Sequence, residues 1–217
     1  MVDIFDEVEE DLRAERAEKL LKKYAWLIIA LAVATVAAVA GWQLWTRYQI
    51  QQDAAAATRY VAVQTAIEQP GYSKTDQIAS LGQLAASAPE GYKTLARLRG
   101  AGLKADTGDL PGAIALWNAV AADSSADPLL RDFASLMATA RELDRGDPVQ
   151  IESRLKPLAE PGNAWSALAR EQLAMLDLRQ GKLEDARQKL QMLTFDADAP
   201  SGLRARASAL LAGLGSK

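Results

Sequence analysis

The side chains that carry most protein chemistry are scarce in this sequence. Its 217 residues include neither cysteine nor histidine, which excludes disulfides, thiolate nucleophiles, histidine bases and Cys/His metal sites. Carboxylates remain, but Glu184 and Asp185 are neighbours in sequence, and neighbouring side chains on a helix do not converge for acid–base catalysis. Asp196 and Asp198 lack the rest of a calcium-binding loop, so we interpret them as part of a turn.

Other candidate sites are equally weak. Gly100-Ala101-Gly102 lacks the Gly-Lys-Ser/Thr ending of a phosphate loop and lies within a helical pattern, so it indicates close helix packing. Trp117 and Trp165 are predicted to be core residues rather than a ligand cage. The first 23 residues contain eight acidic and five basic side chains and account for the formal charge of −3. The remainder is neutral, which argues against nucleic acid as a partner. We predict a non-enzymatic protein with no cofactor, metal or small-molecule substrate.

The most informative stretch is Ala25–Trp42, which contains one hydroxyl group and no charge. As a helix it is about 27 Å long, close to the thickness of a bilayer's hydrocarbon core. Aromatic residues flank it as they do at membrane interfaces: Tyr24, Trp26, Trp42, Trp45 and Tyr48. A buried core helix and a cleavable signal peptide are the alternatives. We predict an uncleaved transmembrane helix over residues 24–48, with a tail at 1–23 and a domain at 49–217.

Lysine and arginine residues predict the orientation of this helix. Five precede it, whereas Arg47 and Arg59 are the basic residues that follow within about 20 positions, and the more basic side stays in the cytoplasm. We expect the tail in the cytoplasm and the 49–217 domain outside. The tail reads as an amphipathic helix over Val2–Lys23, which is either a solvated anchor or a docking helix.

Small residues recur along one face of the predicted transmembrane helix. They permit close approach of a second helix, although alanine is common in such segments: Ala30, Ala34, Ala37 and Gly41. No proline or glycine follows until Pro70, so we expect the helix to continue to about Gln69.

Three glycines give the register of an internal repeat: Gly108, Gly146 and Gly181. Each is predicted to end the first helix of a hairpin in the left-handed conformation, with the second helix starting two to three residues later. Apolar or small residues align at seven offsets from these glycines, namely −13, −12, −7, −3, +5, +9 and +12. One hairpin cannot bury its apolar face alone, so hairpins stack. Helices at about 54–68 and 75–88 are predicted to form a divergent first unit, and a helix at about 201–214 to cap the array.

The segments Gly108–Ile114 and Gly181–Ala186 resemble the turn and second helix of the tetratricopeptide repeat. The fold class we predict is therefore all-α: one N-terminal transmembrane helix followed by a tetratricopeptide-like solenoid. The resemblance implies a concave face lined by the first helices that binds proteins. Candidate residues there are charged, and an ordinary solvated surface explains each of them equally well: Arg97, Lys104, Arg141, Arg170 and Asp177.

The whole layout resembles the ancillary SecYEG translocon subunit family, also called YfgM-like. The resemblance rests on the tail segments Asp3–Val8 and Arg16–Leu20, the single span and the degenerate repeats. It implies a single-pass protein of the bacterial inner membrane with a periplasmic domain, and as partners the SecYEG channel and a membrane-anchored periplasmic chaperone. The expected function is an adaptor that links chaperones or exported clients to the channel. An envelope scaffold in cell-wall or cytochrome assembly needs the same features and is the alternative.

Overall fold

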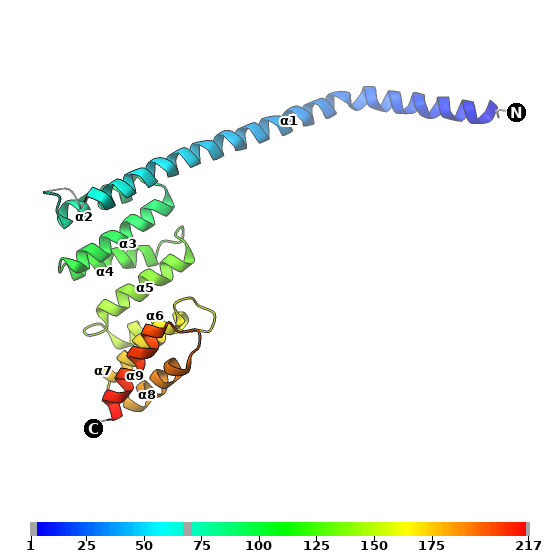
Figure 1. The fold of residues 1–217 in the computed structure, drawn as a ribbon. Helices are drawn as coiled ribbons and strands as arrows, with labels where there is room; N and C mark the ends of the chain where they lie inside the picture. The colour runs from blue at the N-terminus through cyan, green and yellow to red at the C-terminus, as the bar shows by residue number, and fades with distance from the viewer. Residues whose placement is uncertain (1–3, 67–70, 216–217) are drawn as a thin grey trace. The chain divides into compact units, whose positions relative to one another are not determined.

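The computed structural model describes residues 4–66 and 71–215, and within these ranges the chain forms helices and no strand (Figure 1). The predicted all-α class is confirmed. The helices are α1 Ile4–Thr65, α2 Lys74–Ser87, α3 Glu90–Asp106, α4 Leu110–Ala121, α5 Pro128–Glu142, α6 Pro148–Leu158, α7 Ser166–Arg179, α8 Leu183–Phe195 and α9 Ser201–Gly215.

Aspartate and proline start several of these helices. The carboxylates of Asp109, Asp127 and Asp147 each accept a hydrogen bond from a backbone N–H in the first turn of α4, α5 and α6. A proline follows each aspartate within two residues. Proline lacks a backbone N–H, and at these first positions of a helix an N–H would have no acceptor within the helix. The sequence therefore sets where these helices begin.

The chain divides into two compact units between Gln52 and Asp53, and α1 contributes to both. The segment Lys22–Thr65 contains an 18-residue window that is long and apolar enough to cross a membrane, and none of this window is buried. The core helix of a soluble protein, in contrast, is mostly buried. The single hydroxyl in the span, Thr35 Oγ1, donates to Leu31 O at 2.7 Å, which satisfies it within the helix. This part of α1 is a candidate membrane span.

The last turns of α1 belong to the second unit. Ala56 is buried, and the Tyr60 ring lies 6.2 Å from that of Tyr92 on α3. The buried Gln77 amide on α2 donates to Val63 O at 3.1 Å. The end of α1 and α2 thus form the first helical unit that the sequence predicted. The expected continuation to Gln69 and the turn at residues 69–70 lie outside the described residues, as do the side chains that would form the apolar face of the tail.

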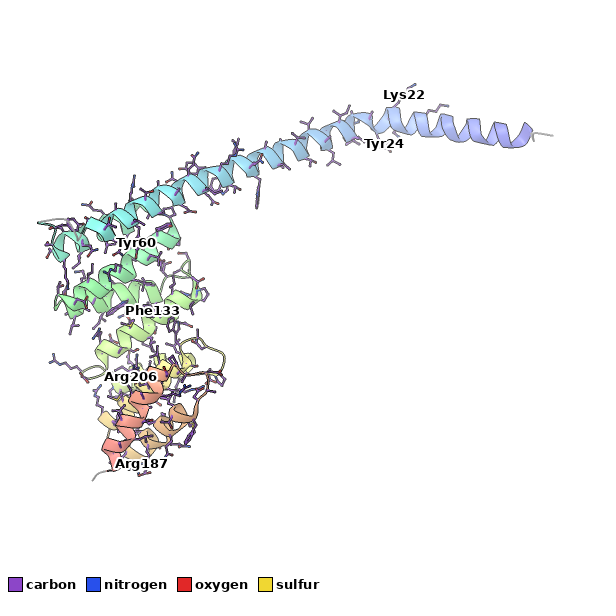
Figure 2. The ribbon with its side chains drawn as sticks, viewed as in Figure 1. Lys22, Tyr24, Tyr60, Phe133, Arg187 and Arg206 are labelled. Atoms are coloured by element: carbon purple, nitrogen blue, oxygen red, sulfur yellow. The ribbon has the colours of Figure 1, made fainter. Side chains whose placement is uncertain are left out.

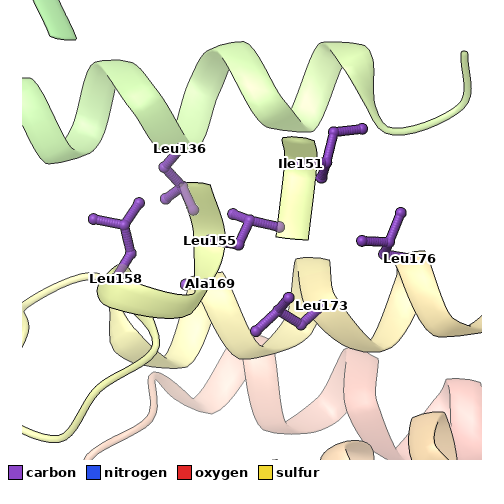
Figure 3. Close-up of a cluster of buried hydrophobic side chains, with 7 residues drawn as sticks. All are labelled: Leu136, Ile151, Leu155, Leu158, Ala169, Leu173 and Leu176. Carbon is purple, nitrogen blue, oxygen red and sulfur yellow. The ribbon is translucent and has the colours of Figure 1, made fainter. Parts of the chain in front are cut away.

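Each hydrophobic core of the second unit is shared by three consecutive helices. The cluster in Figure 3 combines Leu136 of α5, Leu155 of α6 and Leu173 of α7, among others. The clusters before and after it combine α3, α4 and α5, and α7, α8 and α9. A hairpin therefore buries its second helix only when the next hairpin is in place, which is the stacking that defines a helical-repeat array.

The predicted repeat register agrees with burial at five of the seven offsets. Small residues of the first helices at −12 and −7 are buried: Ala96, Ala101, Ala134, Thr139, Ala169 and Ala174. Residues of the second helices at +5, +9 and +12 are buried as well: Ala113, Trp117, Val120, Ile151, Leu155, Leu158, Ala186, Leu190 and Leu193. The offsets −13 and −3 are half-buried or exposed.

Gly108 and Gly181 adopt the predicted left-handed conformation, with φ of +88° and +75°. The two turns have the same hydrogen bonds. Asp109 N donates to Lys104 O and Lys182 N donates to Asp177 O, both at 2.8 Å, as in a Schellman motif. Glycine is favoured here because a Cβ would strain the backbone.

The prediction for Gly146 is wrong, because its φ is not positive. Helix α5 ends at Glu142, four residues before Gly146, so the chain makes an extra irregular turn there. Gly146 N donates to Glu142 O at 2.6 Å. A Cβ on Gly146 would lie 2.9 Å from that oxygen and 3.0 Å from Ile151 Cδ1. Glycine is required at this turn for space rather than for its backbone angle.

These two roles predict different outcomes for substitutions. Gly181→Val is expected to lower the free energy of unfolding by roughly 1 kcal/mol or more through backbone strain. Gly146→Ala is expected to lower it by about 1–3 kcal/mol through steric conflict. Gly82→Ala is the control, because Gly82 lies in the exposed face of α2 with nothing within 4 Å of an added Cβ. It should be neutral or stabilise by up to about 1 kcal/mol. Urea unfolding of the purified proteins measures this, and a neutral Gly181→Val would contradict the assigned turn.

Candidate protein-interaction surface

Two of the predicted partner-binding residues, Arg97 and Arg170, are half-buried in equivalent ion pairs. Arg97 Nη1 on α3 lies 3.0 Å from Asp123 Oδ2, and Arg170 Nη1 on α7 lies 3.2 Å from Asp196 Oδ2. Each arginine is 11 residues before a turn glycine, and each aspartate is 15 residues after the same glycine. The pairs tie a first helix to the loop that leaves its own hairpin. In the middle hairpin, Ser135 and Pro161 occupy these positions and cannot form the pair.

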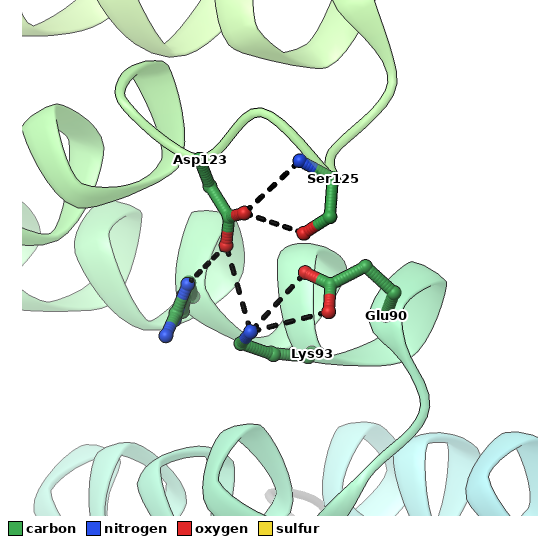
Figure 4. Close-up of polar contacts among 5 residues, drawn as sticks. Glu90, Lys93, Asp123 and Ser125 are labelled. Atoms are coloured by element: carbon green, nitrogen blue, oxygen red, sulfur yellow. Dashed lines mark hydrogen bonds and ion pairs between the residues drawn. The ribbon is translucent and has the colours of Figure 1, made fainter.

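Asp123 is held by several donors (Figure 4). One oxygen accepts hydrogen bonds from the Ser125 hydroxyl and backbone N–H, and the other accepts from Arg97 and lies 3.5 Å from Lys93 Nζ. The Ser125 hydroxyl and N–H, together with the nearby Lys93 and Arg97, lower the pKa of Asp123 well below its ordinary value of 3.8. Asp123 therefore stabilises the fold as a carboxylate.

Two of the three remaining charged candidates form ion pairs, and the third is exposed. Lys104 Nζ lies 2.6 Å from Asp109 Oδ2, across the turn between α3 and α4. Asp177 of α7 pairs with Lys189 of α8. Arg141 is exposed at the end of α5. A partner-binding role for these residues remains a prediction.

Neighbouring first helices are joined by a regular row of hydrogen bonds. Side chains at the N-cap, in the middle and at the end of α7 donate to carbonyl oxygens in α5 and at its C-cap that are seven residues apart: Trp165 Nε1 to Leu129 O, Gln172 Nε2 to Leu136 O, and Arg179 Nη1 to Leu143 O. The sequence separation is 36 residues in each case. Because seven residues are nearly two helical turns, this row holds α5 and α7 side by side in one register.

An apolar cleft lies between the first helices α7 and α9. It has a volume of about 450 Å³, and its lining combines apolar and polar side chains: Glu171, Gln172, Met175, Arg206, Ala209 and Leu210. The guanidinium of Arg206, labelled in Figure 2, makes a bidentate ion pair with the Glu171 carboxylate, in which both N–O distances are 2.8 Å. Gln172 bonds to Leu136 O and to the Thr139 hydroxyl. Because its polar groups are already paired, this α7/α9 cleft presents Met175, Ala209 and Leu210 to an apolar side chain.

Sequence reasoning missed the α7/α9 cleft. Arg206 lines this cleft, and its side chain is 57% exposed. Its pairing with Glu171, 35 residues earlier, matches the repeat length of 35–38 residues. Opposite charges separated by one repeat length were the signal that was available.

The small residues of the predicted transmembrane helix lie on the surface of α1. Ala30, Ala34, Ala37 and Gly41 are all exposed. A Cβ added to Gly41 would meet nothing within 4 Å, so no described contact requires glycine there. Nothing in the chain's own packing explains this row of small residues, and contact with another membrane helix stays a prediction.

Stacked helical hairpins with cores shared between them define a helical-repeat protein. Proteins of this class present extended surfaces that commonly bind other proteins. A comparison with protein families matches residues 19–131 to the tetratricopeptide repeat-like domain. This is more than half of the 217 residues, and the chain belongs to that family. The match begins in α1 and ends in α5. Comparisons with curated proteins and with solved structures give no match.

The pKa of Asp123 predicts a pH dependence of stability. Because its pKa is lowered in the folded state, the stability that it contributes is present above its ordinary value of 3.8 and is lost as pH falls towards the folded-state pKa. Asp123→Asn should lower the free energy of unfolding near pH 6, and this difference from the wild type should shrink below a pH of about 4. Urea unfolding across pH tests this. Asp144→Asn, at an exposed loop position, is the control, and a difference for Asp123→Asn that stays constant with pH would contradict the assigned role.

Proposed function

We propose that this protein is a membrane-anchored adaptor of the Sec translocon that links periplasmic chaperones or exported clients to the channel. The observation that carries the proposal is the unburied apolar window of α1 in a chain that matches the tetratricopeptide repeat-like domain and whose later helices stack as hairpins. The resemblance of the tail, span and repeats to the ancillary SecYEG subunit family supplies the partners. The basic residues before the span favour a cytoplasmic N-terminus and a periplasmic repeat domain.

The two candidate contact regions suit two kinds of partner. The exposed row Ala30, Ala34, Ala37 and Gly41 would pack against a helix of the channel within the membrane. The α7/α9 cleft would accept an apolar side chain from a chaperone or a client. This fits exported chains, which expose apolar residues before they fold. The Glu171–Arg206 pair at the cleft would then flank the bound segment.

Photo-crosslinking in intact cells tests both contacts. A crosslinking amino acid at Ala34 is expected to give adducts with Sec channel subunits, and one at Met175 adducts with a periplasmic chaperone or exported proteins. Val36 and Ala115 are the controls, since Val36 lies almost opposite Ala34 on α1 and Ala115 is exposed on α4, away from the cleft. Adducts with cell-wall or cytochrome-assembly proteins at both test positions would instead support an envelope scaffold. The absence of adducts specific to Ala34 and Met175 would contradict both functions.

A further inference from the structure

Helix α8 carries an exposed apolar pair that the repeat does not explain. Phe195 is 88% exposed and Met192, three residues earlier on the same face, is 56% exposed. The equivalent positions of the other two hairpins are exposed as well, and smaller or polar residues occupy them: Ala119, Ala122, Pro157 and Glu160. A large side chain at these positions adds nothing to the core of its own hairpin. An exposed aromatic and thioether pair is typical of an interaction surface.

The α7/α9 cleft is complementary to this pair. Its volume of about 450 Å³ is within the range of sites that bind apolar groups, and Met175, Ala209 and Leu210 supply apolar contacts. Methionine sulfur also makes favourable contacts with aromatic rings. The cleft therefore suits a phenylalanine side chain.

The charges beside the two surfaces are complementary too. Phe195 is followed by Asp196 and the exposed Asp198. Helix α9 contains Arg204 and Arg206 and no acidic residue, and the side chain of Arg206, labelled in Figure 2, is 57% exposed although it pairs with Glu171 of α7. Glu171 accepts hydrogen bonds from Arg206 Nε and Nη2 within one molecule. Arg206 Nη1 would face Asp198 of another molecule when Phe195 is seated. Opposite charges at the rim favour this pairing over contact between like surfaces.

We propose that the α7/α9 cleft binds Phe195 of a second copy of this chain. The inference rests on the proposed function in treating the cleft as a protein-binding site, and it names the occupant. Anchoring in one membrane would raise the local concentration of copies, so that a weak contact suffices. Self-association would then compete with other partners for the cleft. It would keep the apolar surface of the cleft covered while no other partner is bound.

The experiment places benzoylphenylalanine at position 195 of the full-length chain in membranes. Irradiation is expected to give a covalent dimer, and mass spectrometry of a mixture of isotopically light and heavy chains should map the bond to Met175, Ala209 or Leu210 of the other copy. The same amino acid at Leu183, an exposed apolar position on the same helix, is the control and should give little dimer. Asp198→Lys is expected to lower the yield about fivefold through the rim charge, whereas Asp144→Lys should not.

A result without dimer, or with bonds outside the cleft, would overturn the proposal. Adducts of position 195 with lipid or with other proteins alone would overturn it as well. If position 195 gives no dimer while a crosslinker at Met175 still captures chaperones or clients, self-association fails and the proposed function stands. If a crosslinker at Met175 yields the dimer alone, self-association stands and the proposed use of the cleft by other partners fails.

Discussion

The structure depends on packing large side chains of second helices against small side chains of first helices. Trp117, Leu155 and Leu190 occupy the same register, and each is buried in a core that the following first helix completes. A larger residue at Ala101 or Ala174 would force the two helices of a hairpin apart. Because every core needs its neighbour, the array gains its stability from the interfaces between hairpins.

This constraint also decides which side chains remain for partners. The ion pairs of Arg97 and Arg170 hold the loop that leaves each of their hairpins, and the row of hydrogen bonds between α5 and α7 holds two hairpins in register. The middle hairpin lacks the arginine–aspartate pair, and its outgoing loop is held differently, by Asn163 Nδ2 bonding to Asp132 Oδ2 at 2.9 Å. The apolar side chains of the α7/α9 cleft and the apolar pair on α8 are not used in this way. We therefore propose that partners bind at apolar surfaces rather than at the charged residues that the sequence suggested as candidates.

The sequence predicted the parts of the fold that depend on periodicity and local conformation. The burial at +5, +9 and +12 and the left-handed Gly108 and Gly181 follow from hairpin geometry, so they were accessible. Gly146 was misjudged because a glycine required for space has the same sequence signature as one required for its φ angle. The cleft and the pairing of Arg170 were not predicted, because they depend on contacts between residues 26 to 36 positions apart that the folded array brings together.

We propose that α1 anchors the repeat domain outside the cytoplasm, and membrane sidedness tests this proposal most directly. The native chain has no cysteine, so single cysteines report their own surroundings. Cysteine at Ser201, which is exposed at the start of α9, should react with a membrane-impermeant maleimide in intact spheroplasts. Cysteine at Ala17 in the tail should react only after the membrane is permeabilised. Labelling of Ala17→Cys but not Ser201→Cys before permeabilisation would reverse the orientation, and release of the protein from membranes by alkaline washing would contradict the anchor itself.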